Sequence, residues 1–349
     1  QNLVRDFVKE IKNYVKKYKA IFIKIDPDLV INRTSIYEDE HEDYNKDELL
    51  KIMKDNNFKH LGFTQKFETM QPRFSYRIDF SKDITEVINY FSKTTKQRIK
   101  KAEDLEVEVT IGDKNDIKEF YKLMRITENR KDFVTHNLSY YETLYDLFNK
   151  DNENISATLF LGKIDIKNVI NKITDELAIS TSEKMSLQNI ENRSKKENTR
   201  LKELTSKIEK LNEQLEKYKL FQNEYGDKIT LNGHYIVRYG DMAWVLYAGN
   251  HNILTDTYAN YKTYMEHIKY FSDKVKIYDQ FGTVGKIDKS DSLYGLDEFK
   301  KKFGGDYVEF IGEFDLILNK LMYFVFTKLV PIYRNIIKNI AKKKIKNIK

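Results

Sequence analysis

The sequence predicts a mixed α/β (α+β) fold with two similar domains and a long helical arm inserted in the second. The first observation is the stretch 163–225, which contains no glycine or proline and has apolar residues at spacings of three and four. Its polar segment 191–200 is long enough to reverse the chain between two helices of about 25 residues each, which predicts an antiparallel coiled-coil hairpin. The second observation is that strand-like runs flank the stretch, at 156–162 and at 231–249. A strand that resumes after a helical pair indicates that one domain carries the arm as an insertion.

The third observation is a repeated order of elements. Helix, strand, aspartate, loop, helix and strand occur in turn at 2–80 and again at 256–314. The second copy is preceded by a strand, two helices and three strands, and nothing precedes the first copy. Because the chain also starts at Gln1, within a helical pattern, we expect a fragment whose first domain lacks its front part. The predicted boundaries are 1–104 for the first domain, 105–162 with 226–314 for the second, 163–225 for the arm and 315–349 for a basic helical tail.

In the first half of the chain, apolar residues from Leu3 to Val15 share one face of a predicted helix at 2–17. The run AIFIKI (20–25) predicts a strand, which Asp26-Pro27 ends because proline has no N–H group for ladder pairing. The other elements predicted in this half are helix 46–56, strands at about 58–63 and 73–80, and helices over 82–103.

In the second half, LEVEVTIG (105–112) predicts a strand by its alternation. The other predicted elements are helices 114–128, 138–149, 256–271 and 295–303, strands 275–282 and 307–314, and the tail 315–349, which is apolar at first and strongly basic at its end.

Composition excludes several classes of function. The 349 residues include 61 Lys and Arg against 54 Asp and Glu, and the net charge of +7 favours an anionic partner. The absence of cysteine excludes disulfides, thiolate nucleophiles and cysteine-ligated metals. The six histidines include no pair at metal-ligand spacing, so we expect no metal site. The sequence has no uninterrupted run of about 18 apolar residues and no signal peptide before the first element, so we expect a cytoplasmic protein.

Short motifs occur in a characteristic order along the chain. They are IDP (25–27), QPRFSYRIDF (71–80), TTKQRIKKA (94–102), FYKLMRIT (120–127), SYYETL (139–144), LYAG (246–249), YDQFG (278–282) and GLDEFKKKFGG (295–305). Together with the position of the arm, this order resembles the Fem (FemABX) family of aminoacyltransferases, which build peptidoglycan bridges. The resemblance covers essentially the whole chain. It implies two GNAT-like acyltransferase domains, which the succession of strands and helices also matches.

The resemblance implies transfer of an amino acid (Gly, Ala or Ser) from aminoacyl-tRNA to a stem-peptide or bridge amine of the peptidoglycan precursor lipid II. Aminoacyl-tRNA would be a co-substrate, and no cofactor is expected. The implied partners are aminoacyl-tRNA, lipid II, the inner face of the cell membrane, and a homologous transferase or a second copy of the chain. The basic amphipathic tail 336–349 suits an anionic membrane surface.

The resemblance also implies roles for individual residues. Lys300 and Phe299 match the family's Phe-Lys pair, in which the lysine neutralises phosphate or developing negative charge. Tyr140 and Tyr247 match tyrosines that line the precursor pocket, and Asp26 matches a carboxylate that is a catalytic candidate.

His136 departs from the family pattern, because relatives often carry an arginine there. A neutral imidazole cannot hold a diphosphate in bidentate fashion as a guanidinium does, although a substrate contact by His136 stays open. A further cluster, read from the sequence itself, could contact tRNA or lipid phosphate. It consists of Lys96, Arg98, Lys100 and Lys101.

Simpler interpretations stand beside these. Lys300 lies in the lysine-rich run EFKKKF and could be solvated surface, and Asp26 before Pro27 could be a turn device. The tyrosines could be packing residues, and the basic cluster could be a solvated face. A non-catalytic coiled-coil adaptor for anionic membrane or RNA is the alternative function. An acetyl-CoA-dependent enzyme is disfavoured because no Q/R-x-x-G-x-G/A turn occurs in either half.

Overall fold

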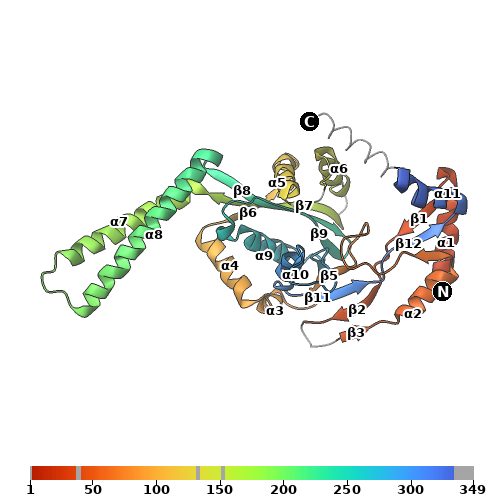
Figure 1. The fold of residues 1–349 in the computed structure, drawn as a ribbon, viewed down its shortest axis with the longest axis horizontal. Coiled ribbons are helices and arrows are strands. Elements are labelled where there is room, and N and C mark those ends of the chain that lie inside the picture. Colours follow the sequence, from red (N-terminus) through yellow and green to blue (C-terminus); the bar gives the residue numbers. More distant parts are fainter. Residues whose placement is uncertain (1, 37–40, 131–133, 151–153, 334–349) are drawn as a thin grey trace. The chain divides into compact units, whose positions relative to one another are not determined.

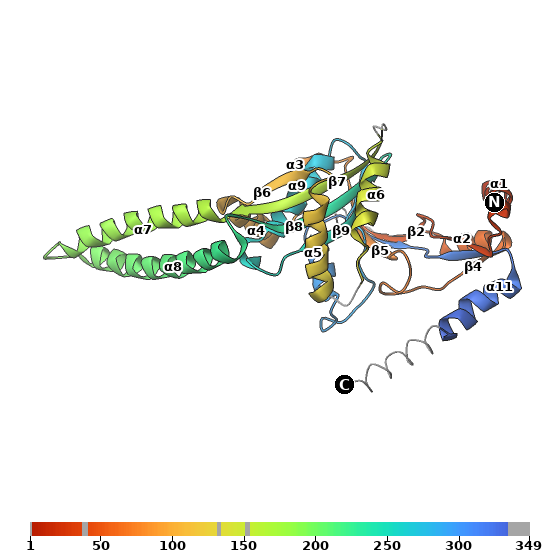
Figure 2. The same cartoon turned by 90° about the horizontal axis from the view of Figure 1, so that it is seen from above.

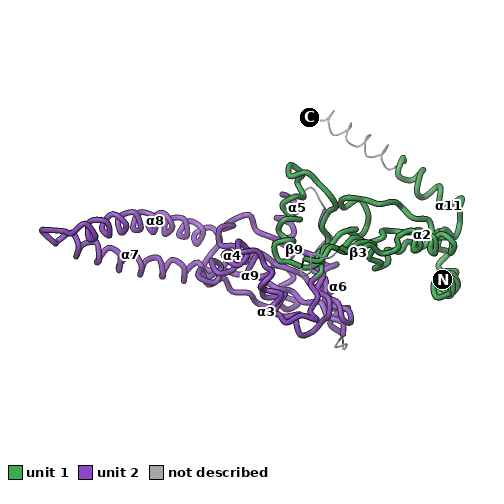
Figure 3. The backbone as a smooth tube through the Cα atoms, turned by 90° about the horizontal axis from the view of Figure 1, so that it is seen from below, with its two compact units in different colours: residues 1–77, 280–349 green, residues 78–279 purple. Residues whose placement is uncertain are grey.

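The structure is a computed structural model, and the residues that it describes are 2–36, 41–130, 134–150 and 154–333 (Figure 1). It is mixed α/β and divides into two compact units (Figure 3). Unit 1 comprises residues 1–77 and 280–349, and unit 2 comprises residues 78–279.

Unit 1 contains strands from both ends of the chain. In its small sheet, β12 (Phe314–Ile317) lies between β1 (Phe22–Ile25) and β4 (Phe58–His60) and is antiparallel to both. Elsewhere, β11 (Asp306–Phe310) pairs antiparallel with β2 (Val30–Thr34) and with the first residues of β5, and β2 pairs with β3. Strand β3 comprises His41–Asp43, and strand β5 comprises Phe74–Asp79.

The helices of unit 1 cover an apolar core. Alternation in β1, β2 and β12 and the apolar faces of α1 and α2 supply buried residues such as Val8, Ile31, Met53, Phe314 and Leu316. The helices are α1 (Asn2–Val15), α2 (Lys46–Asp55), α10 (Tyr294–Lys301) and α11 (Lys320–Phe324), and α11 continues as a π-helical stretch, Val325–Leu329.

Unit 2 is built on five strands in the order β10-β9-β8-β7-β6, antiparallel except for the parallel pair β10–β9. Alternation along β7 directs Leu159 and Leu161 to one face of this sheet, where α5 and α6 pack, and Phe160 to the other, where it meets α9 (Figure 1). The strands are β6 (Glu108–Gly112), β7 (Ile155–Asp165), β8 (Lys228–Tyr239), β9 (Met242–Asn250) and β10 (Ile277–Asp279). The helices beside the sheet are α3 (Ile84–Asn89), α4 (Lys93–Asp104), α5 (Ile117–Arg130), α6 (Leu138–Phe148) and α9 (Ala259–Phe271).

Two long helices, α7 (Ile166–Gln188) and α8 (Lys195–Tyr225), lie side by side and extend from this sheet (Figures 1 and 2). α7 follows β7 without a loop. Asp165, the last residue of β7, caps the helix, because its side chain accepts a hydrogen bond from the N–H of Asn168. α8 begins with a capping box formed by Ser194 and Glu197. The base of the pair is anchored in a core that includes Ile166, Val169, Tyr218, Ile229 and Leu231, which fixes these helices to the sheet of unit 2.

The structure differs from the sequence prediction in several places. The predicted strand 307–314 is two strands, because the chain turns at Gly312 (φ 89°) between β11 and β12. Both strands pair with the N-terminal segment, so residues 280–314 belong to unit 1, whereas the prediction had grouped them with 105–162 and 226–279. The predicted first domain also differs, because 78–104 belong to unit 2.

Other differences are local. The predicted reversal at 191–200 is shorter, because α8 already begins at Lys195. Strands β2 and β3 were not predicted. The predicted helical tail 315–349 begins as strand β12, and residues 334–349, which include the predicted basic amphipathic segment, lie outside the described residues.

Candidate active site

Lys300 lies in the last turn of α10 and is only 6% exposed. Its ammonium group donates hydrogen bonds to the carbonyl oxygens of Phe281 and Gly282, the latter at 2.6 Å. The interpretation of Lys300 as an ordinary solvated lysine is therefore wrong. A buried cation must be compensated by charge or by dipoles, and here two carbonyl dipoles of one loop do so.

The loop 281–284 that receives this lysine is held at each of its residues. Besides the two carbonyl groups bound by Lys300, the Thr283 hydroxyl donates to Asp297 (Oγ1–Oδ1 2.6 Å), and the Tyr307 hydroxyl donates to the carbonyl oxygen of Val284 (3.0 Å). Because Asp297 and Lys300 are one turn apart on α10, the same helix face binds successive parts of the loop.

The loop also contains backbone that needs such support. Phe281 (φ 48°) and Gly282 (φ 71°) lie in the left-handed region, which costs a residue with a side chain about 1–3 kcal/mol. Because several side chains bind this strained loop by hydrogen bonds, it is a rigid, preorganised element. Phe299, the neighbour of Lys300 in the sequence, is half-buried, with its ring 5.2 Å from that of Phe303.

Asp26 lies just after β1. The charged groups that act on its carboxylate are Glu313, Asp28 and Lys24, and Lys300 of α10 is not among them. Although the residue keeps exposed surface, neighbouring atoms remove part of its hydration, which raises the pKa of Asp26 to about 6. The charges of Glu313 and Asp28 raise this pKa further, and Lys24 opposes them. Lys24 forms an ion pair with Glu313 (Nζ–Oε2 3.0 Å), so its positive charge also compensates the charge of Glu313. A carboxyl group with a pKa near neutrality can exchange a proton at working pH.

The structure brings together three predicted substrate-binding residues, His136, Tyr140 and Tyr247, in unit 2. The hydroxyl oxygens of Tyr140 and Tyr247 are 2.9 Å apart, and the His136 ring stacks on Tyr140 with 3.9 Å between centroids. Buried Tyr141 supports them from behind, 5.2 Å from the Tyr247 ring and edge-on to it. Desolvation, followed by the hydrogen bond to Tyr140, raises the pKa of Tyr247. The result is a wall of aromatic faces with neutral hydroxyl groups, suited to a bulky polar ligand.

The four basic residues of the predicted cluster on α4 do not form one patch. Arg98 and Lys101 turn toward tyrosines, because the Arg98 guanidinium donates to the Tyr261 hydroxyl and lies 5.2 Å from the Tyr258 ring centroid. The Lys101 ammonium lies 5.2 Å from the same ring. These two cations therefore already have aromatic partners.

Lys96 and Lys100 lie on the exposed face of α4, one turn apart. Lys96 donates to the carbonyl oxygen of Asn89 at 2.9 Å, which holds it near the start of the helix. The surface that α4 presents to an anion is therefore narrower than the sequence cluster indicated.

The sequence analysis missed a buried chain of hydrogen bonds in unit 2. His234 Nε2 lies 2.7 Å from the Asn260 side-chain oxygen and must donate to it, which leaves His234 Nδ1 to accept from His267 Nε2 at 3.0 Å. His267 Nδ1 then accepts from the Tyr278 hydroxyl at 2.5 Å. Burial, with His234 adding to it, lowers the pKa of His267 well below its usual value, so the His267 ring stays neutral. Spacing rules for metal ligands could not have revealed this chain.

Among the described residues, no group of three or more His, Cys, Asp or Glu is arranged to hold a metal ion. Within those same residues, no helix is long and apolar enough to cross a membrane.

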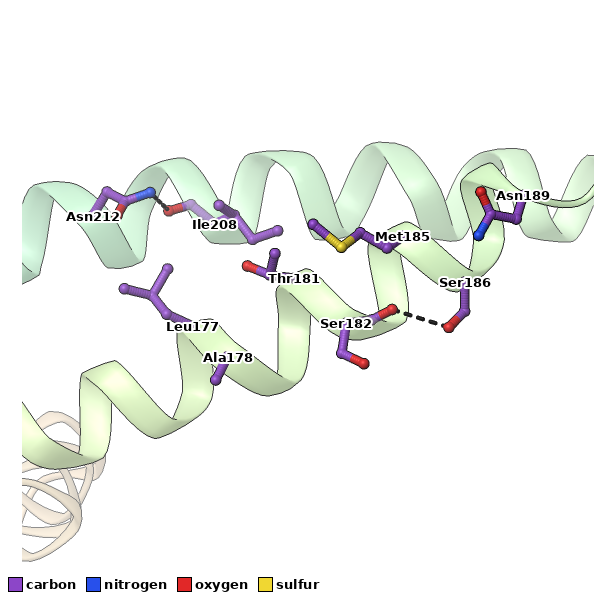
Figure 4. A pocket seen from close by; sticks show the side chains of 9 residues that line it. All are labelled: Leu177, Ala178, Thr181, Ser182, Met185, Ser186, Asn189, Ile208 and Asn212. Atoms are coloured by element: carbon purple, nitrogen blue, oxygen red, sulfur yellow. Dashed lines mark hydrogen bonds between the residues drawn. The ribbon is translucent and has the colours of Figure 1, made fainter.

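A hollow of about 540 Å³ lies between α7 and α8, where Leu177 and Ile208 face each other beside Thr181 and Met185 (Figure 4). No acidic or basic side chain lines it, so it lacks the groups that acyl transfer needs, and we do not assign the reaction to it.

Comparison with known proteins places the whole chain in one group. The FemAB family profile matches residues 1–330. A lipid II:glycine glycyltransferase of Staphylococcus epidermidis is 29% identical over 323 residues, which cover 92% of this chain and 74% of that protein. The Staphylococcus aureus enzyme of the same name is 30% identical over 338 residues, covering 95% and 76%. The crystal structure of FemX has a TM-score of 0.68 and 30% identity, covering 92% of this chain and 78% of that one, so the chain has a FemX-like mixed α/β fold.

Proposed function

Because this chain belongs to the FemAB family, we propose that it transfers glycine from glycyl-tRNA to an amine of lipid II, in formation of the peptidoglycan bridge. The observation that carries this proposal is the match of at least 92% of the chain to relatives named for glycine transfer to lipid II. The tRNA ester as donor follows from the family resemblance. Family membership favours this transferase over a non-catalytic adaptor.

The reaction is aminolysis of an activated ester. A neutral amine attacks the ester carbonyl, so the protein must orient two large substrates and stabilise the developing oxyanion. We assign the positive charge at this step to Lys300, which contributes about 2–4 kcal/mol, the scale of one oxyanion donor. Its binding of the loop 281–284 supports this role, because a preorganised charge needs no rearrangement as the oxyanion forms.

Asp26 is the proposed general base that takes the proton from the attacking amine. Its raised pKa supports the assignment, because a base with a pKa near working pH is both ionised and basic enough to accept a proton.

We propose that the wall formed by His136, Tyr140 and Tyr247 in unit 2 receives the acceptor. For Phe299 in unit 1 we propose a separate apolar contact with a substrate. Neutral phenols and an imidazole bind phosphate oxygens by hydrogen bonds and the sugar or peptide by ring contact. The proposed contact for tRNA or lipid phosphate is the exposed pair Lys96 and Lys100 of α4, together with Arg98 and Lys101.

The finer architecture belongs to the same proposal. We interpret the chain as two GNAT-like domains, with α7 and α8 as a coiled-coil arm inserted in the second. The enzyme would work in the cytoplasm at the inner face of the membrane, where a homologous transferase or a second copy could accompany it.

Transfer of radiolabel tests the proposal directly. Purified protein, lipid II in detergent and tRNAs charged with labelled Gly, Ala or Ser should yield label in lipid II from glycine. Transfer only from Ala or Ser would change the donor assignment. Binding of lipid II without transfer from any of the three would remove the enzymatic proposal and favour the adaptor.

A further inference from the structure

The loop 61–73, which connects β4 to β5 in unit 1, has no role in the proposed chemistry. A connection of this length without helix or strand is uncommon and is usually functional. Its end is fixed by Arg73, which is 2% exposed and donates to the carbonyl oxygens of Thr64 (2.8 Å) and Phe310 (3.1 Å). Three large apolar side chains of this anchored loop are nevertheless exposed, namely Phe63, Phe67 and Met70.

The middle of this loop lies against the loop 281–284 of the candidate site and the residues that follow it. The N–H of Gly285 donates to the carbonyl oxygen of Gln65 at 2.8 Å, so the two backbones are in direct contact. Lys66 forms an ion pair with Asp291, farther along the same segment. The connection between β4 and β5 is therefore part of the surroundings of the candidate site in unit 1.

Phe67 packs on one of the residues that bind Lys300. A methyl group added at Gly282 would lie 3.2 Å from Phe67 Cε1 and 3.3 Å from Pro72 Cγ, so both rings contact this glycine. The carbonyl oxygen of Gly282 accepts a hydrogen bond from Lys300 at 2.6 Å. The Phe67 side chain is also 45% exposed, so part of its ring remains open to a ligand.

The position of this ring bears on the size of the amino acid that is transferred. In the proposed reaction, Lys300 stabilises the oxyanion that forms on the ester carbonyl. The α-carbon of the aminoacyl group is bonded directly to that carbonyl carbon, so a side chain on the α-carbon also lies close to Lys300. Because Phe67 packs on Gly282, its ring occupies space beside the same charge. Glycine has no Cβ atom that would need this space.

We propose that Phe67 determines the specificity for the transferred amino acid, because its ring restricts the space beside Lys300 to a glycyl group. An apolar wall discriminates against one additional methyl group by about tenfold or more, and it rejects an added hydroxyl group little better. Alanyl and seryl esters should therefore be disfavoured to a similar degree. The proposal rests on the proposed function, since it takes Lys300 as the charge at the ester carbonyl.

A single tRNA body that is chemically acylated with Gly, Ala or Ser tests the proposal, because only the amino acid differs among these donors. With lipid II in detergent, kcat/KM of the unchanged full chain should be about tenfold or more higher for Gly than for Ala or Ser. Phe67→Ala should reduce this ratio to about two, by raising transfer from Ala and Ser. A purely structural role of Phe67 would lower transfer from all three donors and leave the ratio unchanged. Equal use of Gly and Ala by the unchanged protein would overturn the proposal.

Phe63→Ala is the matched control for this substitution. Phe63 belongs to the same loop and is 42% exposed, but its ring lies 4.7 Å from the His60 ring and 4.7 Å from the Arg73 guanidinium carbon. This variant should keep the preference for Gly. An equal loss of preference in Phe63→Ala and Phe67→Ala would overturn the proposal.

Phe67→Leu provides a second measurement if the alanine variant is unstable. Leucine removes only part of the ring volume, so the ratio of Gly to Ala should be intermediate between those of the unchanged protein and Phe67→Ala. Thermal unfolding checks that both variants fold, which we expect because the Phe67 side chain is 45% exposed. A preference for Gly that is unchanged in both variants would overturn the proposal.

The same assay keeps this proposal separate from the proposed function. Glycine transfer by the unchanged protein, with the same ratio of Gly to Ala in Phe67→Ala, would remove the size restriction and leave the transferase in place. Absence of transfer from all three donors would remove the transferase and, with it, the role of Phe67.

Discussion

Two regions of this molecule present polar groups in opposite ways. Around α10, a cation is buried, and Lys300 binds two carbonyl oxygens of the loop 281–284. In the wall of His136, Tyr140 and Tyr247, the contacts are made between neutral rings, and Tyr140 keeps more than a third of its surface exposed.

The two regions differ in the polar groups that a substitution would leave without a partner. Removal of a buried charge partner leaves desolvated carbonyl oxygens and a strained loop without support, which is costly. Removal of one hydroxyl group from an aromatic wall leaves a site that water or substrate can complete. We therefore expect all-or-none behaviour at Lys300 and graded behaviour at the wall.

The largest effect is expected for Lys300→Met, which keeps most of the side-chain length but loses the charge. Transfer activity should fall by about 10³, the upper range for loss of one oxyanion-stabilising group. The free energy of unfolding should fall by about 2 kcal/mol, because two buried carbonyl oxygens lose their donor. Kinetics of transfer and urea unfolding measure the two effects.

Lys301→Met is the matched control, since Lys301 is the exposed next residue of the same helix. It should change neither quantity by more than a small factor. If the two variants behave alike, Lys300 is neither a catalytic nor a loop-holding residue.

The next effect in size is expected for Asp26→Asn, and it depends on pH. The pKa of Asp26 is raised from 3.8 to about 6, so the folded protein binds this proton more tightly than the unfolded chain does. Ionisation of Asp26 therefore costs stability as pH rises between about 4 and about 6. The variant should be more stable than the unchanged protein at pH 8 and equally stable at pH 4, as thermal unfolding can show.

The rate of transfer should depend on the same ionisation of Asp26. In the unchanged protein, the rate should rise with pH up to about 6, and Asp26→Asn should lower it about 10²-fold and remove that limb. Asp55→Asn, an exposed aspartate of α2, serves as the control. A pH limb that persists in Asp26→Asn would assign the base to another group.

The sequence predicted the local elements well, because their patterns are local. The spacing of apolar residues in 163–225 anticipated two long helices, and the Asp26-Pro27 end of β1 was read correctly. The pairing of strands from distant segments could not be predicted from the sequence. Nothing in FDLI (314–317) indicates that it lies between strands more than 250 residues earlier in the chain.

The candidate site shows the same division. The run EFKKKF looks like a solvated face, and only the fold reveals that Lys300, unlike Lys301, turns toward the loop 281–284. The sequence resemblance selected His136, Tyr140 and Tyr247, and the structure brings these three into contact. The α4 cluster was read as one patch, although a helix turns residues 98 and 101 away from residue 96.

Graded behaviour at the aromatic wall can be measured with a double-mutant cycle of Tyr140→Phe and Tyr247→Phe. Each single change removes one partner of the 2.9 Å hydrogen bond and should raise the KM for lipid II a few-fold, with little effect on kcat. The coupling free energy should be about 1 kcal/mol or less, since one hydrogen bond is lost in either variant. Tyr145→Phe on the same helix α6 is the control. A loss of activity as large as that of Lys300→Met would show that the wall, too, behaves in an all-or-none manner.

The smallest effect, and the only gain in apparent affinity for substrate, is expected for His136→Arg. His136 stacks on Tyr140 at 3.9 Å, and a guanidinium can keep this stacking while adding a bidentate donor for a diphosphate. The KM for lipid II should fall about two- to fivefold, whereas the KM for an acceptor peptide without diphosphate should stay the same. His136→Gln, which supplies a neutral donor, should not reproduce the gain. An equal improvement for both acceptors would mean that the arginine acts through Tyr140 and not on the diphosphate, and the wall would then be a peptide-binding surface.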